Sequence, residues 1–377
     1  MKSSSKKEYR EIQSRSLVEW TNAEIKTARI LADSGSFLYL GELVDELLAD
    51  DRVKGVLPQR VSGLLGLPLT FEASGDGRKK GRAVRALETE EDWWVIASES
   101  EIQQIQSYAL LAGLALAELV WTNDEDTGRV LPKLKPWSIK YLRFDWQLRQ
   151  WFLRTDDFSE IQIQPGDGKW LLYTPYGSNR PWSHGLWRAL GKWFLSKQFS
   201  ISDWARHSEI HGSGIRVGIA AEGALAKDRE AYADDLAEMG SDTSMVPPHG
   251  WDLKLVEAKA RTWEMFPANI DKANEAISIV LVGQNLTSNV QSGSLAAAQV
   301  HDAVREDLIR FDALALSTAL HDQVLTWWAE FNFGSRNLAP WPVWDTKKPA
   351  PPVATAPSND KTPPDKAAKT NDPNTTK

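Results

Sequence analysis

Two histidines, His207 and His211, stand four residues apart in a stretch whose pattern predicts a helix. At that spacing both imidazoles project from one helix face, where they can share a metal ion. Glu209, however, does not stand where the zinc-peptidase motif H-E-x-x-H has its general base. The pattern therefore favours two surface or interface histidines. A metal-dependent hydrolase built on His207 and His211 is kept as an alternative.

The stretch Gly185–Lys192 reads GLWRALGK and has a superficial likeness to a phosphate-binding loop. The loop motif G-x-x-x-x-G-K-[ST] is one residue shorter, and Trp193 stands where that motif has the hydroxyl that binds Mg²⁺. The absence of cysteine excludes a thiolate metal site and a cysteine nucleophile, and it fits a reducing cytoplasm. No carboxylate pair stands out as an acid–base couple. We therefore predict no catalytic residue, no metal site and no cofactor.

Composition is that of a globular chain with room for two or three domains, since the 377 residues are 42% hydrophobic and 25% charged. No apolar run reaches the roughly 18 residues of a membrane span, and the polar start MKSSSKKEYR lacks the apolar core of a secretory signal. The net charge of −7 argues against a tight grip on DNA, but an acidic wall suits a channel in which DNA slides. The 18 tryptophans are typical of large buried areas such as subunit interfaces.

The stretch Gln284–Ser294 contains only small or polar uncharged residues, apart from Leu286 and Val290. A loop that grips phosphates would carry Lys or Arg, and one that binds a protein tightly would carry aromatic or Arg anchors. Small polar side chains instead make brief, water-mediated contacts that are easily replaced. The stretch is followed by an amphipathic pattern that predicts one long helix ending at Gly334.

The region around this loop resembles the closing part of the Mu-type family of tailed-phage portal proteins. The matching residues are Gly283-Gln284-Asn285-Leu286-Thr287, His301 and Arg305. Further matches occur in the same order as in the family, over roughly residues 37–334. They are the DRVKGVLPQRVSGLLGLPLTFEAS segment, Gly113, Glu118 and Trp121 before a β-hairpin, and Gly185, Lys197, Phe199, Trp204, Glu209 and Gly212 along a stem helix.

The resemblance implies an α+β portal fold with a wing of helices and a small antiparallel sheet, a two-helix stem, a β-α-β-β clip and a long C-terminal wing helix. The expected bounds are an N-terminal wing region at 1–180, a first stem helix at 181–211, the clip at 212–262, a second stem helix at 263–283, a tunnel loop at 284–294, a long wing helix at 295–334 and a largely disordered tail at 335–377. In the family this loop projects into the channel next to DNA. The residues expected to line the channel are Gln284, Asn285, Thr287, Ser288, Asn289, Gln291, Ser292 and Ser294.

Within these regions the residue patterns predict individual elements. Helices are expected at 17–32, 37–48, 56–65, 101–120, 181–210 and 227–239. Strands are expected at 69–73, 139–144, 148–153, 161–164, 170–173, 215–219 and 251–256, with a further strand starting at 245–246, and the strands at 161–164 and 170–173 are expected to form a hairpin. The basic stretch 75–85 is expected to be a solvated loop, with contact to nucleic acid as the alternative.

The function that the resemblance implies is a portal protein in the virion, at one vertex of the capsid, assembled in the host cytoplasm. The subunits would form a closed ring, a dodecamer as in the family, through which double-stranded DNA passes during packaging and ejection. The implied partners are further copies of the chain, the terminase large subunit, a head-completion or adaptor protein and the major capsid protein, with no membrane. The alternatives are the hydrolase described above and a non-ring structural protein of a capsid or phage-like particle.

Overall fold

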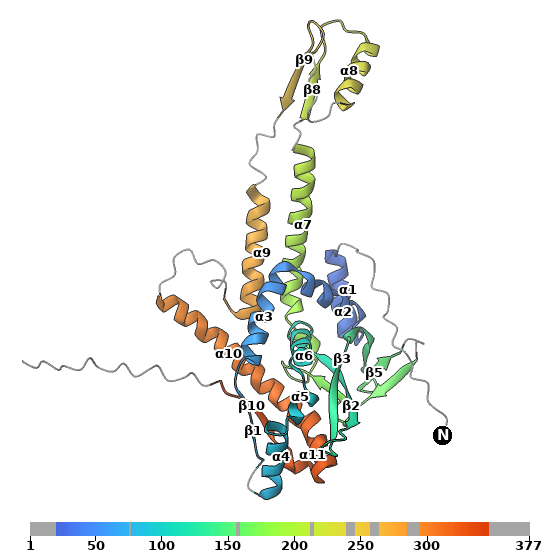
Figure 1. Ribbon diagram of the computed structural model, residues 1–377. Helices are drawn as coiled ribbons and strands as arrows, with labels where there is room; N and C mark the ends of the chain where they lie inside the picture. The colour runs from blue at the N-terminus through green and yellow to red at the C-terminus, as the bar shows by residue number, and fades with distance from the viewer. Residues whose placement is uncertain are drawn as a thin grey trace, which may run out of the picture. The chain divides into compact units, whose positions relative to one another are not determined.

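The computed structural model describes residues 20–74, 77–155, 159–211, 215–238, 246–256, 264–284 and 295–346. Residues up to Asp345 belong to one compact unit, and the description below concerns that unit (Figure 1).

Three helices open the described chain: α1 (Asn22–Ser34), α2 (Leu38–Ala49) and α3 (Asp51–Leu65). The start of α1 is a capping box between Thr21 and Glu24, and the Asp50 carboxylate caps α3 by accepting from the first backbone N–H groups. Between α1 and α2 the chain turns at Gly35, whose φ is 96°. A Cβ there would lie 2.0 Å from the carbonyl oxygen of Phe144, so only glycine fits.

The basic stretch expected to be a loop is a helix, α4 (Arg78–Glu88), which packs beside the short helix α5 (Asp92–Ile96). The expectation was wrong because it was based on the charged residues and did not take into account the helical spacing of the apolar residues between them. Ala83, Ala86 and Leu87 fall on one helix face and are buried.

The helix expected to continue to Val120 ends much earlier, because α6 covers Glu99–Ala112 and Gly113 terminates it with φ of 89°. Residues Ala115–Asn123 form strand β2 instead. The first part of β2 is buried on both faces, so it lacks the alternation that marks a half-exposed strand. An Ala/Leu-rich run of this kind has the same appearance in sequence as a buried helix.

Two three-stranded antiparallel sheets follow, with strand orders β3-β2-β7 and β4-β5-β6. Their remaining strands are β3 (Val130–Trp137), β4 (Leu142–Asp145), β5 (Gln150–Arg154), β6 (Glu160–Ile163) and β7 (Trp170–Tyr173). The expected hairpin of β6 with β7 is wrong, since β6 pairs with β5 and β7 pairs with β2. The turn between them is held by Trp327 from the far end of the chain, whose indole N–H donates to the Gly166 carbonyl at 2.8 Å.

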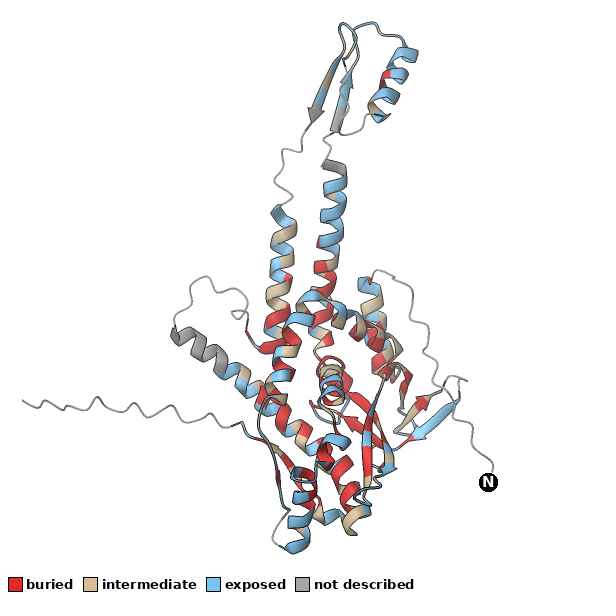
Figure 2. Ribbon diagram, viewed as in Figure 1, coloured by how far each residue is buried: buried red, intermediate tan, exposed pale blue. Residues whose placement is uncertain are grey.

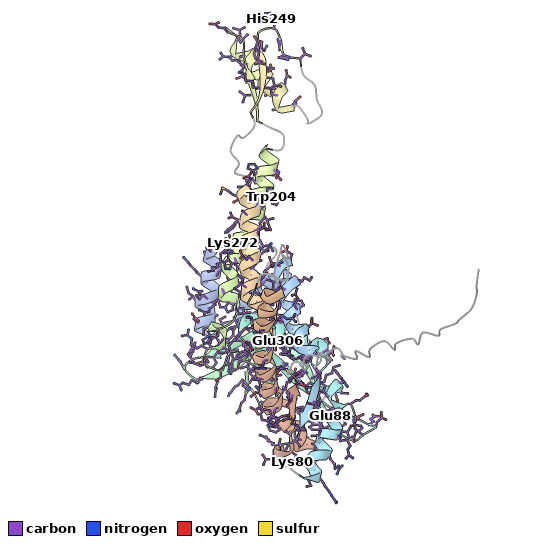
Figure 3. All side chains as sticks on the ribbon, turned by 90° about the vertical axis from the view of Figure 1, so that its left-hand side faces the viewer. Lys80, Glu88, Trp204, His249, Lys272 and Glu306 are labelled. Atoms are coloured by element: carbon purple, nitrogen blue, oxygen red, sulfur yellow. The ribbon has the colours of Figure 1, made fainter. Side chains whose placement is uncertain are left out.

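Two long helices, α7 (Trp187–His211) and α9 (Met265–Val282), pack side by side (Figures 1 and 3). The first was expected to begin at Pro181, but Pro181–Ser183 is a separate 3-10 turn. The helix starts later because the Leu186 N–H donates to the Leu110 carbonyl at 3.1 Å, and because Gly185 lies against the Ala112 backbone. The chain thus docks on the end of α6 before it enters α7.

Between α7 and α9 in the sequence lies a small unit of its own. Strands β8 (Ile215–Ile219) and β9 (Asp252–Val256) pair antiparallel, and helix α8 (Ala226–Glu238) packs on β8. Tyr232 of α8 is buried against Gly218, where a Cβ would lie 2.6 Å from the phenyl ring. Residues 239–245, which include the first residue of the further strand expected at 245–246, lie outside the described residues.

The last helical run occupies the range where one long helix was expected, with one difference. It consists of α10 (Leu295–Leu320), a π-helical turn η4 (His321–Leu325) and α11 (Thr326–Phe333), and it ends at Gly334. Beyond it, Trp341–Trp344 form β10, which pairs with β1 (Leu69–Glu72). The folded part therefore continues past residue 335, where the tail was expected to begin. Residues 347–377 lie outside the described residues.

Buried side chains gather in two clusters (Figure 2). One lies among α1, α2, α3, the start of α7 and the end of α9. The other lies between the sheet β3-β2-β7 and the run α10–α11. Some of the tryptophans form the core itself, since Trp182, Trp187 and Trp328 are fully buried.

Candidate functional site

The loop between α9 and α10 is the candidate site, and the structure shows how its ends are held. Of the eight residues expected to line a channel, Gln284 is described. The other seven lie outside the described residues: Asn285, Thr287, Ser288, Asn289, Gln291, Ser292 and Ser294. The site must therefore be built from the elements on either side of the loop.

At the first end of the loop, α9 closes at Gly283, which has φ of 75° and donates its N–H to the Ile279 carbonyl at 2.9 Å. A Cβ at Gly283 would lie 2.7 Å from a methyl group of Val304 on α10. Helix α10 therefore crosses directly over the exit of α9, and only glycine permits that approach. Gln284 follows with 2% of its surface exposed, so it is an anchoring residue at the base of the loop.

One buried arginine ties both sides of the loop to the body. Arg60 on α3 donates from Nε and Nη2 to the two carboxylate oxygens of Asp312 on α10, at 2.6 and 2.8 Å. Its Nη1 donates to the carbonyl oxygen of Leu281, near the end of α9, at 3.0 Å. The loop begins at Gln284, three residues after Leu281, and leads into α10, which carries Asp312. A single guanidinium therefore links the two helices on either side of the loop.

The residues around Arg60 and Asp312 include polar groups, but these groups have a structural role. Burial raises the pKa of Asp312, and the hydrogen bonds from Arg60 offset this only in part. Burial also raises the pKa of Tyr176 to about 12 and that of Tyr173 well above its ordinary value. Both phenols therefore stay protonated at neutral pH, so neither tyrosine exchanges a proton near pH 7.

Two further polar contacts attach the helix pair to the body. Arg52 on α3 donates from Nε to the Ser278 hydroxyl on α9 at 2.7 Å. Lys197 on α7, whose side chain is 3% exposed, lies 2.9 Å from Asp50 and also contacts Asp51. The hydrogen bond from Lys197 holds the pKa of Asp51 below its ordinary value. The start of α3 is thus the common support of α7 and α9.

Of the two histidines considered for a metal site, the structure describes the surroundings of His207. His207 lies on α7 with its ring 5.7 Å from that of Phe266 on α9, and His211 is the last residue of α7. Among the residues that the structure describes, no three His, Asp or Glu side chains are grouped to hold a metal ion. Gly191 and Lys192 lie inside α7, where backbone amides are used by the helix, and Gly191 packs against Ile25.

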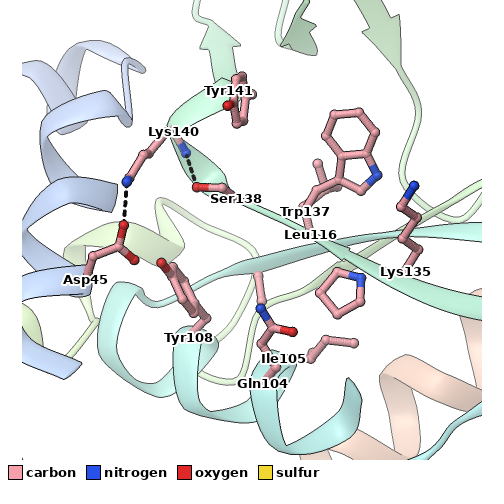
Figure 4. Close-up of a pocket in the computed structure, with 12 residues that line it drawn as sticks. Asp45, Gln104, Ile105, Tyr108, Leu116, Lys135, Trp137, Ser138, Lys140 and Tyr141 are labelled. Atoms are coloured by element: carbon pink, nitrogen blue, oxygen red, sulfur yellow. Dashed lines mark hydrogen bonds and ion pairs between the residues drawn. The ribbon is translucent and has the colours of Figure 1, made fainter. Parts of the chain in front are cut away.

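A pocket of about 340 Å³ lies between α2, α6 and the hairpin β2–β3 (Figure 4). Its lining includes Lys135, Trp137 and Tyr108, and its Lys140 is already paired with Asp45. None of the residues expected to act in catalysis or in a channel lines it, so the pocket is separate from the candidate site.

Arg60 and Asp312 were not singled out from the sequence, although a signal was present. Each is a charged residue on an apolar helix face. Arg60 stands between the buried residues Leu57 and Val61, and Asp312 stands between Ile309 and Leu316. A charge at such a position is buried only with a partner, but the sequence does not say which one.

Within the described part of the chain, none of the helices combines the length and apolar character that crossing a lipid bilayer requires. The elements instead follow the order of a portal fold: a helical body with small antiparallel sheets, two paired helices separated by a β-α-β unit, and a long helix after a short loop. The class that this architecture defines is the portal subunit.

Comparison with known proteins assigns the family. The family model of the portal protein of Mu bacteriophage matches residues 41–362, and the chain belongs to this family. It is 23% identical to the portal protein of Escherichia phage Mu over an alignment of 298 residues that covers 72% of this chain and 57% of that relative. It is 25% identical to the Mu-like prophage FluMu protein gp29 of Haemophilus influenzae over 225 residues, covering 56% of this chain and 41% of the relative.

A solved structure shares the fold. A chain in the neck of a native gene transfer agent particle, computed with C12 symmetry, matches with a TM-score of 0.54 and 12% identity, covering 86% of this chain and 91% of that one. The chain spans about half the length of the curated relatives that it matches.

Proposed function

We propose that this chain is the subunit of a portal ring at one capsid vertex, with double-stranded DNA passing through the central channel during packaging and ejection. The observation that carries the proposal is the clamp of Arg60 on Leu281 and Asp312, because it holds rigid supports on both sides of one short polar loop. A loop that must keep its place beside moving DNA needs such supports.

Apolar surface on the paired helices and on α10 supports assembly into a ring. Phe199, Ile201 and Trp204 on α7 are 41%, 48% and 42% exposed, and Leu314 on α10 is 65% exposed. Figure 3 shows the position of Trp204. A single soluble subunit rarely leaves large side chains of neighbouring turns in water, whereas a second copy would cover them. A dodecamer is the proposed ring, by analogy with the family and with the C12 symmetry of the similar neck structure.

The proposal assigns mechanical and electrostatic work to the chain and no catalysis. The packaging ATPase would be a separate protein, the terminase large subunit, docking near the β8-α8-β9 unit. A head-completion or adaptor protein and the major capsid protein would be the other partners. The ring would assemble in the host cytoplasm and remain in the virion. Asn285, Thr287, Ser288, Asn289, Gln291, Ser292 and Ser294 would line the channel beyond Gln284.

The mass of the purified protein, together with a negative-stain image, tests the ring. We expect particles of roughly twelve chains of 42.2 kDa with a central hole. Subunits of a closed ring bury surface on two sides, so the particle should persist at low micromolar concentration. A monodisperse monomer under several salt conditions would contradict the proposal.

A further inference from the structure

Helix α4 concentrates positive charge on an otherwise acidic chain. The chain as a whole has a net charge of −7. Within Arg78–Glu88, however, five cations accompany one carboxylate: Arg78, Lys79, Lys80, Arg82, Arg85 and Glu88. A local field of this sign attracts an anionic partner even when the rest of the surface repels it.

Three of the cations share the solvent face of α4. Arg78, Arg82 and Arg85 are exposed and stand at positions i, i+4 and i+7, opposite the buried face formed by Ala83, Ala86 and Leu87. We call these three side chains the arginine face. Their Cα atoms span roughly 10 Å along the helix, at 1.5 Å per residue.

The arginine face is not used inside the subunit. Across the described ranges, none of its three guanidinium groups has a hydrogen bond or an ion pair, whereas Lys80 and Glu88 on the same helix each have a backbone partner. Lys80 donates to the Ser74 carbonyl at 2.9 Å, and Glu88 accepts from the Phe71 N–H at 2.8 Å. The one carboxylate of the helix is therefore engaged elsewhere, while the three arginines, and Lys79 beside them, have no partner among the described residues.

A glycine beside this face leaves the helix backbone accessible. Gly81 lies inside α4 on its solvent side, and a Cβ there would meet nothing within 4 Å. A glycine in a helix interior lowers stability relative to alanine, and packing within this chain does not require it. What it does provide is open backbone beside Arg78, Arg82 and Arg85.

We propose that the arginine face binds the sugar-phosphate backbone of duplex DNA without sequence preference, at a place separate from the loop between α9 and α10. Guanidinium groups pair with phosphate oxygens in a bidentate manner, and one DNA strand presents about three phosphates over roughly 10 Å of its axis. Gly81 allows the backbone to approach the helix closely. This contact goes beyond the proposed passage of DNA through a ring, since a single subunit carries it.

The composition of the face favours DNA over an acidic protein. A protein partner is usually held by a large aromatic or apolar anchor at the centre of the contact, and the arginine face contains none. An exposed aromatic residue, Trp94, does lie on the adjacent helix α5, with 55% of its surface exposed. That side chain serves to distinguish the two partner classes in the test.

Binding to covalently closed circular duplex plasmid tests the proposal, because a closed circle cannot thread a preformed ring. We expect the variant Arg78→Gln/Arg82→Gln/Arg85→Gln to bind plasmid about tenfold or more weakly at moderate salt, and its slope of log K against log salt to be less negative by about 3. Gly81→Leu should favour the helix yet weaken binding by crowding the backbone. The matched control Lys54→Gln/Lys133→Gln/Lys227→Gln removes as much charge from exposed positions elsewhere and should keep wild-type affinity.

Equal losses in the arginine variant and its control would overturn the proposal, because net charge alone would then explain binding. Plasmid affinity that survives in the arginine variant would overturn it too. If Trp94→Ser then abolished binding of an acidic protein probe, a protein would be the partner class. Circular dichroism shows whether α4 still folds in each variant. The mass of the same preparations separates this inference from the proposed ring. Monomers that bind plasmid through the arginine face would contradict the ring alone. Rings whose plasmid binding does not depend on α4 would contradict this inference alone.

Discussion

At the scale of single residues, Arg60 joins more of the molecule than any pattern around it suggests. From its position on α3, its side chain contacts Asp312 on α10 and Leu281 on α9. A buried ion pair is weak evidence for stability, since apolar residues of similar volume often serve as well. Its value here is position, because one planar guanidinium sets the geometry of two helix ends at once.

Removing only the cation should therefore be much worse than removing the pair. We expect Arg60→Met to lower the free energy of unfolding by about 3–5 kcal/mol, because it leaves the Asp312 carboxylate buried without its partner. The double variant Arg60→Met/Asp312→Leu should recover much of that loss, since no charge then stays buried. Urea unfolding followed by tryptophan fluorescence measures both. Equal stability of the single and double variants would mean that the pair contributes by volume alone.

At the scale of elements, the run α10–α11 forms hydrogen bonds to both edge strands of the sheet on which it lies. The sheet order is β3-β2-β7, so β3 and β7 are its edges. On β7, the Gln323 amide accepts from the Leu172 N–H at 3.0 Å and donates to the Leu172 carbonyl at 3.1 Å. On β3, the Asn332 amide does the same for Val130, at 2.8 and 2.9 Å.

One of these two amides stands in the π-helical turn. Gln323 lies in the middle of His321–Leu325, where the extra residue changes the helix phase between α10 and α11. Both amides then meet an edge strand, and backbone groups that would invite another strand are satisfied. A regular helix over the same range would not keep this phase.

Substituting Gln323 should cost more than its side-chain volume implies. We expect Gln323→Leu to lower the free energy of unfolding by about 1–3 kcal/mol, because the N–H and C=O of the buried residue Leu172 lose their partners. Gln59→Leu, at an exposed position on α3, makes the same chemical change and should stay within about 0.5 kcal/mol. Thermal or urea unfolding of both variants gives the comparison. A loss no larger at Gln323 than at Gln59 would show that the edge needs no such seal.

At the scale of the whole molecule, a substitution in one chain is repeated in every subunit of the proposed ring. The loop from Gln284 to Ser294 carries no charge, so a low-friction contact with DNA depends on the absence of strong phosphate partners. Adding charge there should matter more than removing polarity.

We expect Asn289→Lys to leave rings intact and to slow DNA packaging or ejection, most strongly at low salt, where a ring of positive charge holds phosphates longest. Asn289→Gln keeps the loop neutral and should transport DNA at the wild-type rate. A packaging assay at two salt concentrations, with ring integrity checked by mass, measures both variants. DNA transport by Asn289→Lys rings at the wild-type rate would place the loop away from the channel.

Much of the architecture could be predicted from the sequence, because the signals involved are local. Periodicity and turn residues located the early helices, although α1 and α3 begin at Asn22 and Asp51 and not at the expected residues 17 and 56. They also located the second long helix and the end of the last helical run at Gly334, and the order of family motifs indicated the portal fold. These features depend on neighbours a few residues apart, which propensity and pattern report directly.

The tertiary structure alone decided the pairings between distant segments. Nothing near β7 says that it joins β2 and leaves β6, and nothing near Trp341 says that it pairs with Glu72 at the far end of the chain. Arg60 and Asp312 are 252 positions apart, so the partner of each buried charge is set by how the helices stack. Such contacts are chosen by the combined burial of many side chains, and no short window of residues contains that information.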